Sequence, residues 1–240
     1  PFTIRLILGR GWGQGPTHSQ NLQSWFAHIP GLKVVMPATA QDAKGLLLSS
    51  IFDNNPVIFL EHRWLYALEG EVVESDYRIE IGKAAIMRGG TDITIVSMSY
   101  MTIEALHACE TLEKVNISCE LIDLRTVRPI DWSTIYSSVK KTGRLIVLDT
   151  GTKALSVAGE IIATVAEDCW EYLTMAPTRV AMPDSPEPTS FGLSREYYMD
   201  AVDITIEVIR MLGREDLLNT IDLNKRTPHD VPGDWFKGPF

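Results

Sequence analysis

Seven short apolar runs alternate with helix-like segments along most of this chain, and this alternation limits the possible folds more than any other feature. The runs are TIRLIL (3–8), KVVMP (33–37), VIFLE (57–61), DITIVSM (92–98), CELIDL (119–124), RLIVLD (144–149) and TRVAM (178–182). Several of them lack polar alternation, which is typical of strands that are covered on both faces of a parallel sheet. The sequence therefore predicts an α/β fold, with largely parallel or mixed sheets and helices on both faces.

The segments between the runs carry helical periodicity. We predict helices near 20–28, after Thr39 as N-cap, around 101–114, from Asp131, around 155–172 and over 201–212. The predicted buried stripes are Ala43, Leu46, Leu47, Ser50 and Ile51; Trp132, Ile135, Tyr136 and Val139; and Leu155, Ala158, Gly159, Ile162, Val165, Ala166 and Cys169. Each stripe predicts a helix that packs one face on a sheet.

The periodicity fails between the third and fourth apolar runs, where the chain is acidic with scattered Tyr and Ile. We therefore divide the chain into a first unit at 1–62, a connector at 63–84, a second unit at 85–213 and a C-terminal arm at 214–240. The arm ends in a Pro/Gly-rich stretch that carries Trp235, Phe236 and Phe240. Aromatic side chains on such a tail favour burial against another surface, so we predict an intersubunit contact for 222–240.

Composition and charge exclude several classes of partner. The chain has 240 residues and a formal net charge of −9, without a basic run. These values argue against a nucleic-acid surface or an anionic membrane as partner. No apolar stretch reaches 18 residues, and three widely spaced cysteines are typical of reduced, buried thiols. We expect a cytoplasmic protein that acts on small molecules together with protein partners.

The segment GRGWGQGPTHSQ follows the first predicted strand and places glycines at 9, 11, 13 and 15 before His18. Its spacing differs from the G-x-G-x-x-G of a dinucleotide site, and the chain has no P-loop motif, H-x-x-x-H pair or C-x-x-C pair. A histidine beyond the carboxyl end of a strand lies where open α/β sheets place ligands, and imidazole exchanges protons near neutral pH. His18 is the catalytic candidate; the alternative is a tight loop in which His18 only caps a helix or bonds a carbonyl.

This segment, with WFAHIPGLKVVMPATAQDAKGLLLSSIFDNNPVIFLEHRWLY, LIDLRTVRPIDWSTI and KKTGRLIVLD, resembles the β subunit of the thiamine-diphosphate-dependent first component of 2-oxo acid dehydrogenases. The resemblance runs nearly continuously from Phe2 to Leu148 and more loosely to Leu212. It implies a transketolase-like fold: 1–62 would be the C-terminal part of a pyrimidine-binding domain, and 85–213 a transketolase C-terminal domain.

The resemblance also implies a reaction and its partners. The cofactor's carbanion attacks a 2-oxo acid, carbon dioxide leaves and the acyl group passes to lipoamide, with His18 beside the thiazolium moving protons. The implied partners are an α subunit that holds the diphosphate and its magnesium, a second β subunit in an α2β2 assembly, and a lipoyl acyltransferase.

A structural potassium ion is a further implication of the resemblance. The matching positions are Ser50, Ile51, Asp53 and Asn55, mostly through backbone carbonyls, with Phe2 as a further ligand. A hard oxygen cage suits such an ion. The residues alone favour an ordinary turn between a helix and a strand at Asp53–Pro56, and only the resemblance favours the ion.

The chain also departs from the resemblance. The glutamate that activates the cofactor and the aromatic residue that stacks on its pyrimidine ring both match positions before Pro1, so we expect an upstream portion to be missing and the 240 residues alone to be inactive. The segment 149–155 and the arm beyond Leu212 are not family features. Two alternatives therefore stay open: a two-subunit transketolase or related ketol or acyl transferase, and a non-catalytic dimerisation or docking fragment.

Overall fold

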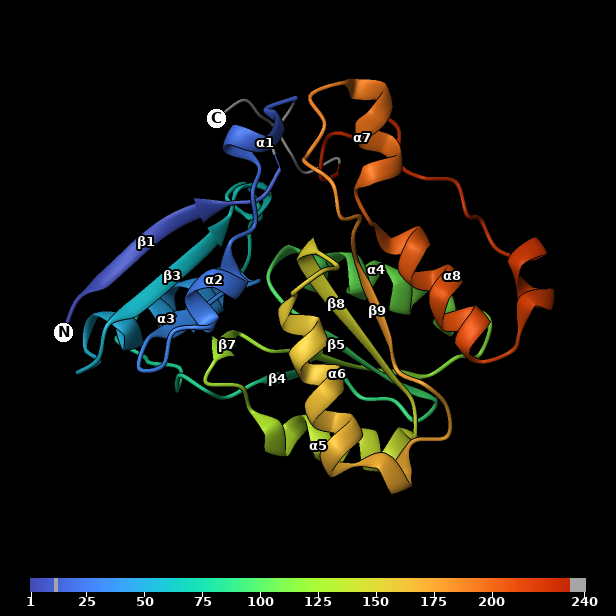
Figure 1. Cartoon of the computed structure of the whole chain (residues 1–240), viewed down its shortest axis with the longest axis horizontal. Coiled ribbons are helices and arrows are strands. Elements are labelled where there is room, and N and C mark those ends of the chain that lie inside the picture. The colour runs from blue at the N-terminus through green and yellow to red at the C-terminus, as the bar shows by residue number, and fades with distance from the viewer. Residues whose placement is uncertain (11–12, 234–240) are drawn as a thin grey trace.

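The computed structural model describes residues 1–10 and 13–233, which form two mainly parallel sheets with helices on both sides (Figure 1). The strands are β1 (Thr3–Leu8), β2 (Lys33–Val35), β3 (Val57–His62), β4 (Ala85–Arg88), β5 (Ile93–Ser97), β6 (Cys119–Asp123), β7 (Thr126–Arg128), β8 (Leu145–Thr152) and β9 (Thr178–Met182). The helices are α1 (Gly15–His18), α2 (Gln23–Ala27), α3 (Ala40–Ile51), α4 (Tyr100–Glu113), α5 (Trp132–Thr142), α6 (Val157–Asp168), α7 (Phe191–Tyr197) and α8 (Ala201–Met211). Short 3₁₀ helices are η1 (Arg63–Leu65), η2 (Trp170–Tyr172) and η3 (Glu215–Asn219). The predicted α/β fold class is confirmed.

The first sheet has the strand order β1-β3-β2-β7. Strands β1, β3 and β2 run parallel, whereas β7 pairs antiparallel with β2. β7 comes from the second series of strands, so the two predicted units share a sheet. The left-handed backbone of Arg125 (φ 58°) turns the chain into β7, and Met36 N donates to the Arg125 carbonyl at 2.8 Å. A three-residue strand is too short to show a period in the sequence.

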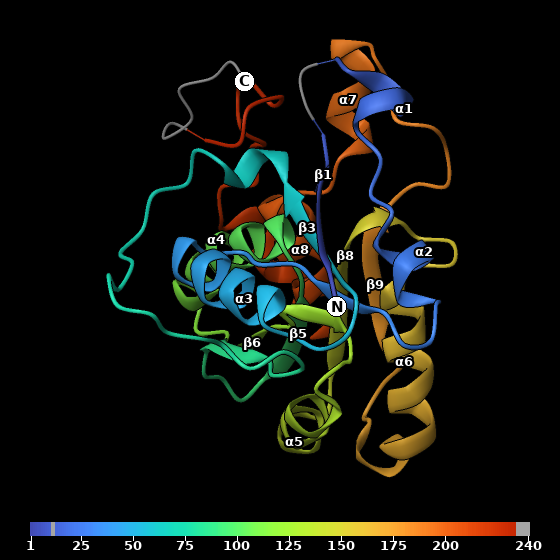
Figure 2. The ribbon, with the colours of Figure 1, turned by 90° about the vertical axis from the view of Figure 1, so that its left-hand side faces the viewer.

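The second sheet has the strand order β4-β6-β5-β8-β9, and only β4 is antiparallel to its neighbour. Apolar side chains of α4 and α8 pack on one face and those of α5 and α6 on the other. The core under α5 and α6 also contains Leu8, Val34, Met36, Ile58 and Leu60 from the first sheet. One apolar cluster therefore holds the two sheets together. Figure 2 views the ribbon from the side of the first sheet.

Side chains cap two helices, α3 and α5, at the residues predicted from the sequence. Thr39 Oγ1 accepts from Asp42 N at 3.1 Å, and Asp131 Oδ1 accepts from Thr134 N at 3.3 Å. Two stripe predictions are wrong at their ends: Ile51 is 56% exposed, and Leu155 lies before α6 with φ 54° and 94% exposure. Ser156 caps α6, so its buried face is Val157, Ala158, Ile161 and Val165.

The C-terminal arm returns over its own chain. Lys225 Nζ lies 2.7 Å from Asp203 Oδ2, and His229 Nε2 lies 2.9 Å from Ser194 Oγ on α7. The described part, up to residue 233, therefore has an intramolecular binding surface that the sequence did not reveal, and its intersubunit contact stays a prediction. Trp235, Phe236 and Phe240 lie outside the described residues. None of the described helices is long and apolar enough to cross a membrane.

Candidate active site

The glycine loop (residues 9–15) follows β1 and turns back at its first glycine. Gly9 has φ 85°, and a β-carbon built there would lie 2.2 Å from Nε2 of His62, so only glycine fits. Gly9 N also donates to the Gln20 carbonyl at 3.2 Å. The loop thus closes on itself against the end of β3.

His18 is the last residue of the short helix α1, and its side chain is exposed. Its imidazole makes no hydrogen bond with any residue that the structure describes, but its carbonyl accepts from Arg63 Nη2 at 3.0 Å. Gly13 and Gly15 both lie against Thr189 of the second unit. A β-carbon added at Gly13 would lie 3.0 Å from the Thr189 carbonyl oxygen, and one added at Gly15 would lie 3.0 Å from Thr189 Oγ1. Backbone contacts therefore position α1, and the histidine ring faces outward.

Arg10 follows Gly9 directly, and its side chain is buried. Its guanidinium carbon lies 3.6 Å from the centroid of Trp64 and 4.3 Å from that of Tyr198. Burial lowers the pKa of Arg10. Cation–π contacts with two rings compensate part of the desolvation, and each is worth about 2 kcal/mol when water is excluded. Arg10 anchors the start of the glycine loop between the two units.

His62 lies beneath this loop and is a functional neighbour that the sequence did not single out. Burial, with the nearby charges of Arg10 and Arg63, lowers the pKa of His62 to about 3. Its Nδ1 accepts from Trp64 N at 3.2 Å, so the proton is assigned to Nε2, and its ring stacks on Tyr100 at 4.9 Å. A histidine that stays neutral above pH 4 is a packing group here.

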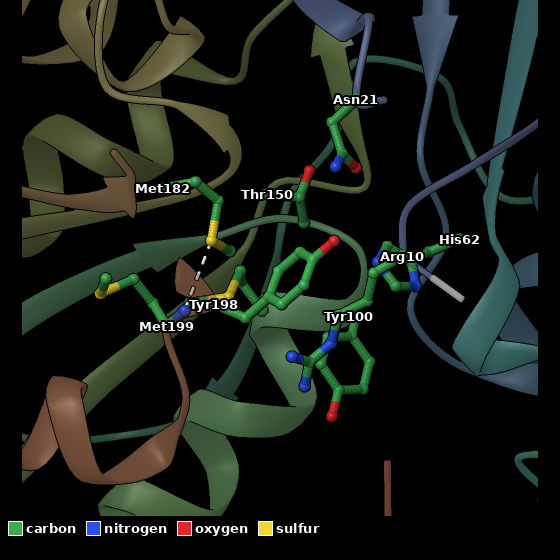
Figure 3. A pocket seen from close by; sticks show the side chains of 9 residues that line it. Arg10, Asn21, His62, Tyr100, Thr150, Met182, Tyr198 and Met199 are labelled. Carbon is green, nitrogen blue, oxygen red and sulfur yellow. Dashed lines mark hydrogen bonds between the residues drawn. The ribbon is translucent and has the colours of Figure 1, made fainter. Parts of the chain in front are cut away.

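Figure 3 shows the small cavity between these residues. Its volume is about 10 Å³, and it is lined by Arg10, Asn21, His62, Tyr100, Met101, Thr150, Met182, Tyr198 and Met199. Such a volume holds about one water molecule and no organic cofactor.

Asp149 joins the glycine-loop segment to the second sheet. Its carboxylate accepts from Gln23 Nε2 at 2.5 Å, Gly151 N at 2.9 Å and Ala158 N at 3.1 Å. Burial raises the pKa of Asp149, and these three donors oppose the increase. The segment 149–155, which departs from the family pattern, thus holds α2 against β8 and the start of α6.

The predicted ion ligands do come together, at the turn between α3 and β3. The Phe2 carbonyl accepts from Val57 N at 3.0 Å, and the Ser50 carbonyl accepts from Thr3 Oγ1 at 2.8 Å. Burial pushes the pKa of Asp53 upward, but hydrogen bonds from Lys33 and Asn55 outweigh burial and hold it below its usual value. These oxygens already have donors, and the Lys33 ammonium contacts the Asp53 carboxylate.

No cluster of three or more His, Cys, Asp or Glu side chains that could hold a metal occurs among residues 1–10 and 13–233. The potassium site therefore stays a prediction that rests on carbonyl oxygens at Phe2, Ser50 and Ile51, with the side chains of Asp53 and Asn55.

Two family models match the chain: the transketolase pyrimidine-binding domain over residues 3–69 and the transketolase C-terminal domain over residues 82–204. A solved structure of a split-gene transketolase, an inactive β4 tetramer, has a TM-score of 0.72 and is 22% identical, and the match covers 88% of this chain and 66% of that chain. At this identity the similarity shows the fold alone.

Curated relatives are more similar in sequence. The β subunit of acetoin:2,6-dichlorophenolindophenol oxidoreductase from Cupriavidus necator is 45% identical over 85% of this chain and 60% of the relative. The β subunit of the pyruvate dehydrogenase E1 component from Bacillus subtilis is 45% identical over 79% of this chain and 59% of the relative. The mitochondrial β-1 subunit of the pyruvate dehydrogenase E1 component from Oryza sativa is 43% identical over 85% of this chain and 56% of the relative. The chain thus spans about 60% of the length of these relatives.

These matches confirm the resemblance seen in the sequence. The chain belongs to the transketolase-like, thiamine-diphosphate-dependent family, and the relatives that it is similar to in sequence are β subunits of the pyruvate dehydrogenase E1 component and of an acetoin oxidoreductase.

Proposed function

We propose that this chain forms the active-site and assembly portion of the β subunit of a thiamine-diphosphate-dependent 2-oxo acid dehydrogenase. The observation that carries the proposal is His18, exposed at the end of a glycine loop that Gly9, Arg10 and Thr189 hold in place. The β-subunit relatives support the same function.

When bound, thiamine diphosphate supplies the carbon centre at which a 2-oxo acid loses carbon dioxide. This chain contributes a proton carrier at that centre. The His18 ring is exposed, is not engaged by any described residue and is of the residue type that gains or loses a proton near neutral pH. Arg63 fixes the end of α1 through the His18 carbonyl, which leaves both ring nitrogens available to a substrate.

The described residues fit one half of a cofactor site. The loop and His18 offer a wall and a proton carrier, but no carboxylate cluster is present there for a magnesium ion. We propose that an α subunit supplies the magnesium and diphosphate ligands and that a glutamate outside these 240 residues activates the cofactor. This chain alone is then inactive. Intact mass of the freshly purified natural product, compared with 26.8 kDa for these residues, tests whether an upstream part exists.

The wider assembly is part of the same proposal: a second β subunit, and transfer of the acyl group to a lipoyl acyltransferase, in the cytosol. The three buried free cysteines support a reducing compartment. For the turn at Phe2, Ser50, Ile51, Asp53 and Asn55 we propose a potassium ion bound by backbone carbonyls; a rise in melting temperature with K⁺ but not with Li⁺ tests it.

Relatives of two kinds give two candidate donors. Pyruvate, from the pyruvate dehydrogenase relatives, would lose carbon dioxide. Acetoin, from the acetoin oxidoreductase relatives of C. necator and B. subtilis, has no carboxyl group, so cleavage of the carbon–carbon bond beside its carbonyl would release acetaldehyde instead. Reduction of an artificial electron acceptor by the α–β assembly with each donor distinguishes them. Ketol transfer between sugars instead indicates a two-subunit transketolase.

The decisive variant is His18→Gln in the full-length β subunit assembled with its α subunit. We expect donor-dependent reduction of the acceptor to fall 10²-fold or more, about the size of a lost general acid–base group. His28→Gln, at another exposed histidine, is the matched control and keeps full activity. Equal activity of the two variants contradicts the proposed role of His18.

A further inference from the structure

The C-terminal arm carries a positive charge into the interior of the second unit. Arg226 Nη2 donates to Glu104 Oε1 at 3.2 Å, and Arg226 Nη1 donates to the Val231 carbonyl at 3.3 Å within the arm. Glu104 lies on α4 and is fully buried. Residue 226 lies beyond the segment 82–204 that matches the family model.

Glu104 has few compensating partners besides Arg226. Tyr100 O–H donates to Oε1, and Ala201 N donates to Oε2 at 2.9 Å, at the start of α8. Both donors are neutral. A buried carboxylate that loses its only cation becomes strongly unfavourable, and any other cation within reach is drawn toward it.

Arg10 of the glycine loop is a second cation whose charge interacts with that of Glu104. Tyr100 separates the two arginines: its hydroxyl contacts Glu104 and its ring packs edge-on against Trp64 at 5.3 Å, the ring on which Arg10 lies. The Arg10 guanidinium makes no hydrogen bond with the described residues and is held by its two aromatic rings. The charge of Glu104 acts on Arg10, favouring its protonated form, and Arg226 opposes it. Figure 3 shows Arg10 beside Tyr100 and Tyr198.

We propose that Arg226 is a positioning residue for the glycine loop. While Arg226 pairs with Glu104, the Arg10 guanidinium stays on the Trp64 ring. When Arg226 is removed, Arg10 turns toward the Glu104 carboxylate and displaces the loop. Arg226 thereby acts on the position of α1 and His18 through Glu104 and Arg10. The consequence for catalysis rests on the proposed function, whereas the movement of Arg10 does not.

The first test uses the 240-residue chain labelled with 5-fluorotryptophan, without cofactor. The Trp64 resonance, assigned with Trp64→Phe, reports the cation that lies 3.6 Å from its ring. We expect Arg226→Met to shift this resonance and the double variant Glu104→Gln/Arg226→Met to restore it, because Arg10 then has no carboxylate to turn to. Lys225→Met breaks the neighbouring ion pair of the arm with Asp203 and leaves the resonance unchanged.

Three outcomes overturn the proposal: an unshifted resonance in Arg226→Met, a double variant that stays shifted, or a Lys225→Met variant shifted equally. The second would mean that packing of the arm, not charge, holds the loop. If Arg226→Met does not fold, Arg226→Gln replaces it; its amide still donates to Glu104 but carries no charge, so the same shift and the same rescue are expected.

The second test uses the full-length subunit assembled with its α subunit. We expect Arg226→Met to lower kcat about tenfold or more with little change in KM, because a displacement of about 1 Å at a reacting group reduces rates to this degree, and Glu104→Gln/Arg226→Met to recover it. A shifted resonance together with an active His18→Gln variant would retain the role of Arg226 and contradict the proposed function. An inactive His18→Gln variant together with an unshifted Trp64 resonance in Arg226→Met would retain the proposed function and contradict the role of Arg226.

Discussion

Gly9 and His62 touch at the point where the glycine loop leaves β1: a β-carbon at Gly9 would lie 2.2 Å from the imidazole Nε2. The ring cannot move away, because Tyr100 stacks on its face at 4.9 Å and Trp64 N donates to its Nδ1. The contact fixes the direction in which the loop leaves β1.

Gly9→Ala should therefore displace the loop and destabilise the chain. The variant combines a clash with a left-handed backbone, so we expect a loss of roughly 2 to 4 kcal/mol in the free energy of unfolding. Gly31→Ala is the matched control, since Gly31 has nearly the same φ, 87°, with no atom within 4 Å of the added carbon. Urea unfolding compares them. Equal losses would show that backbone strain alone is responsible.

His62 should make the stability of the chain sensitive to acid. Burial lowers its folded pKa to about 3, so between pH 6.5 and 3 the unfolded state binds a proton that the folded state does not. The contribution of His62 to stability is full above pH 6.5 and falls as pH decreases. We expect His62→Asn to cost less stability, relative to the wild type, at pH 4.5 than at pH 7.5. His28→Asn, at an exposed site, should show no such pH dependence.

Asp123 should give the opposite slope. Burial, with the charge of Asp42 nearby, raises the pKa of Asp123 to about 7, so the folded state keeps a proton that the unfolded state has lost above pH 4. The contribution of Asp123 to the free energy of unfolding is full below pH 4. It is lost as the pH rises to 7, by at most about 1.4 kcal/mol per pH unit.

Asp123→Asn should accordingly be more stable than the wild type at pH 8 and gain nothing at pH 4. Urea unfolding at the two values, with the exposed Asp76→Asn as control, measures the difference. An advantage that is the same at both pH values would show that Asp123 is not protonated in the folded chain.

Leu155 is strained and exposed, so its removal should stabilise the chain. It has φ 54° and 94% exposure in the loop before α6. Leu155→Gly relieves a left-handed conformation at little cost in burial, and we expect a gain of about 1 kcal/mol. Leu193→Gly, also exposed but within α7, should lose about the same amount. The midpoints of urea unfolding decide; a loss in Leu155→Gly would mean that Leu155 makes a contact in the assembly.

The sequence by itself determined the elements that have a long local signal. The seven apolar runs all became strands, and Thr39 and Asp131 cap the helices that they were predicted to begin. Strand periodicity and side-chain capping act over a few neighbouring residues, so they are visible without the fold. The ordered strings around GRGWGQGPTHSQ likewise indicated the family that the comparisons confirm.

Only the tertiary structure decided which residues surround the glycine loop. Arg10 and Trp64 lie in the strings that indicated the family, but neither they nor Tyr100 and Glu104 were predicted to meet, and Arg226 lies in an arm that was expected to reach another subunit. The three-residue strand β7 joins the first sheet because Arg125 turns the backbone, and Leu155 misses the buried stripe because Ser156 caps α6 one residue later. These outcomes depend on burial and on charges far apart in the chain, and a buried charge chooses its partner by distance in the folded protein rather than by spacing in the sequence.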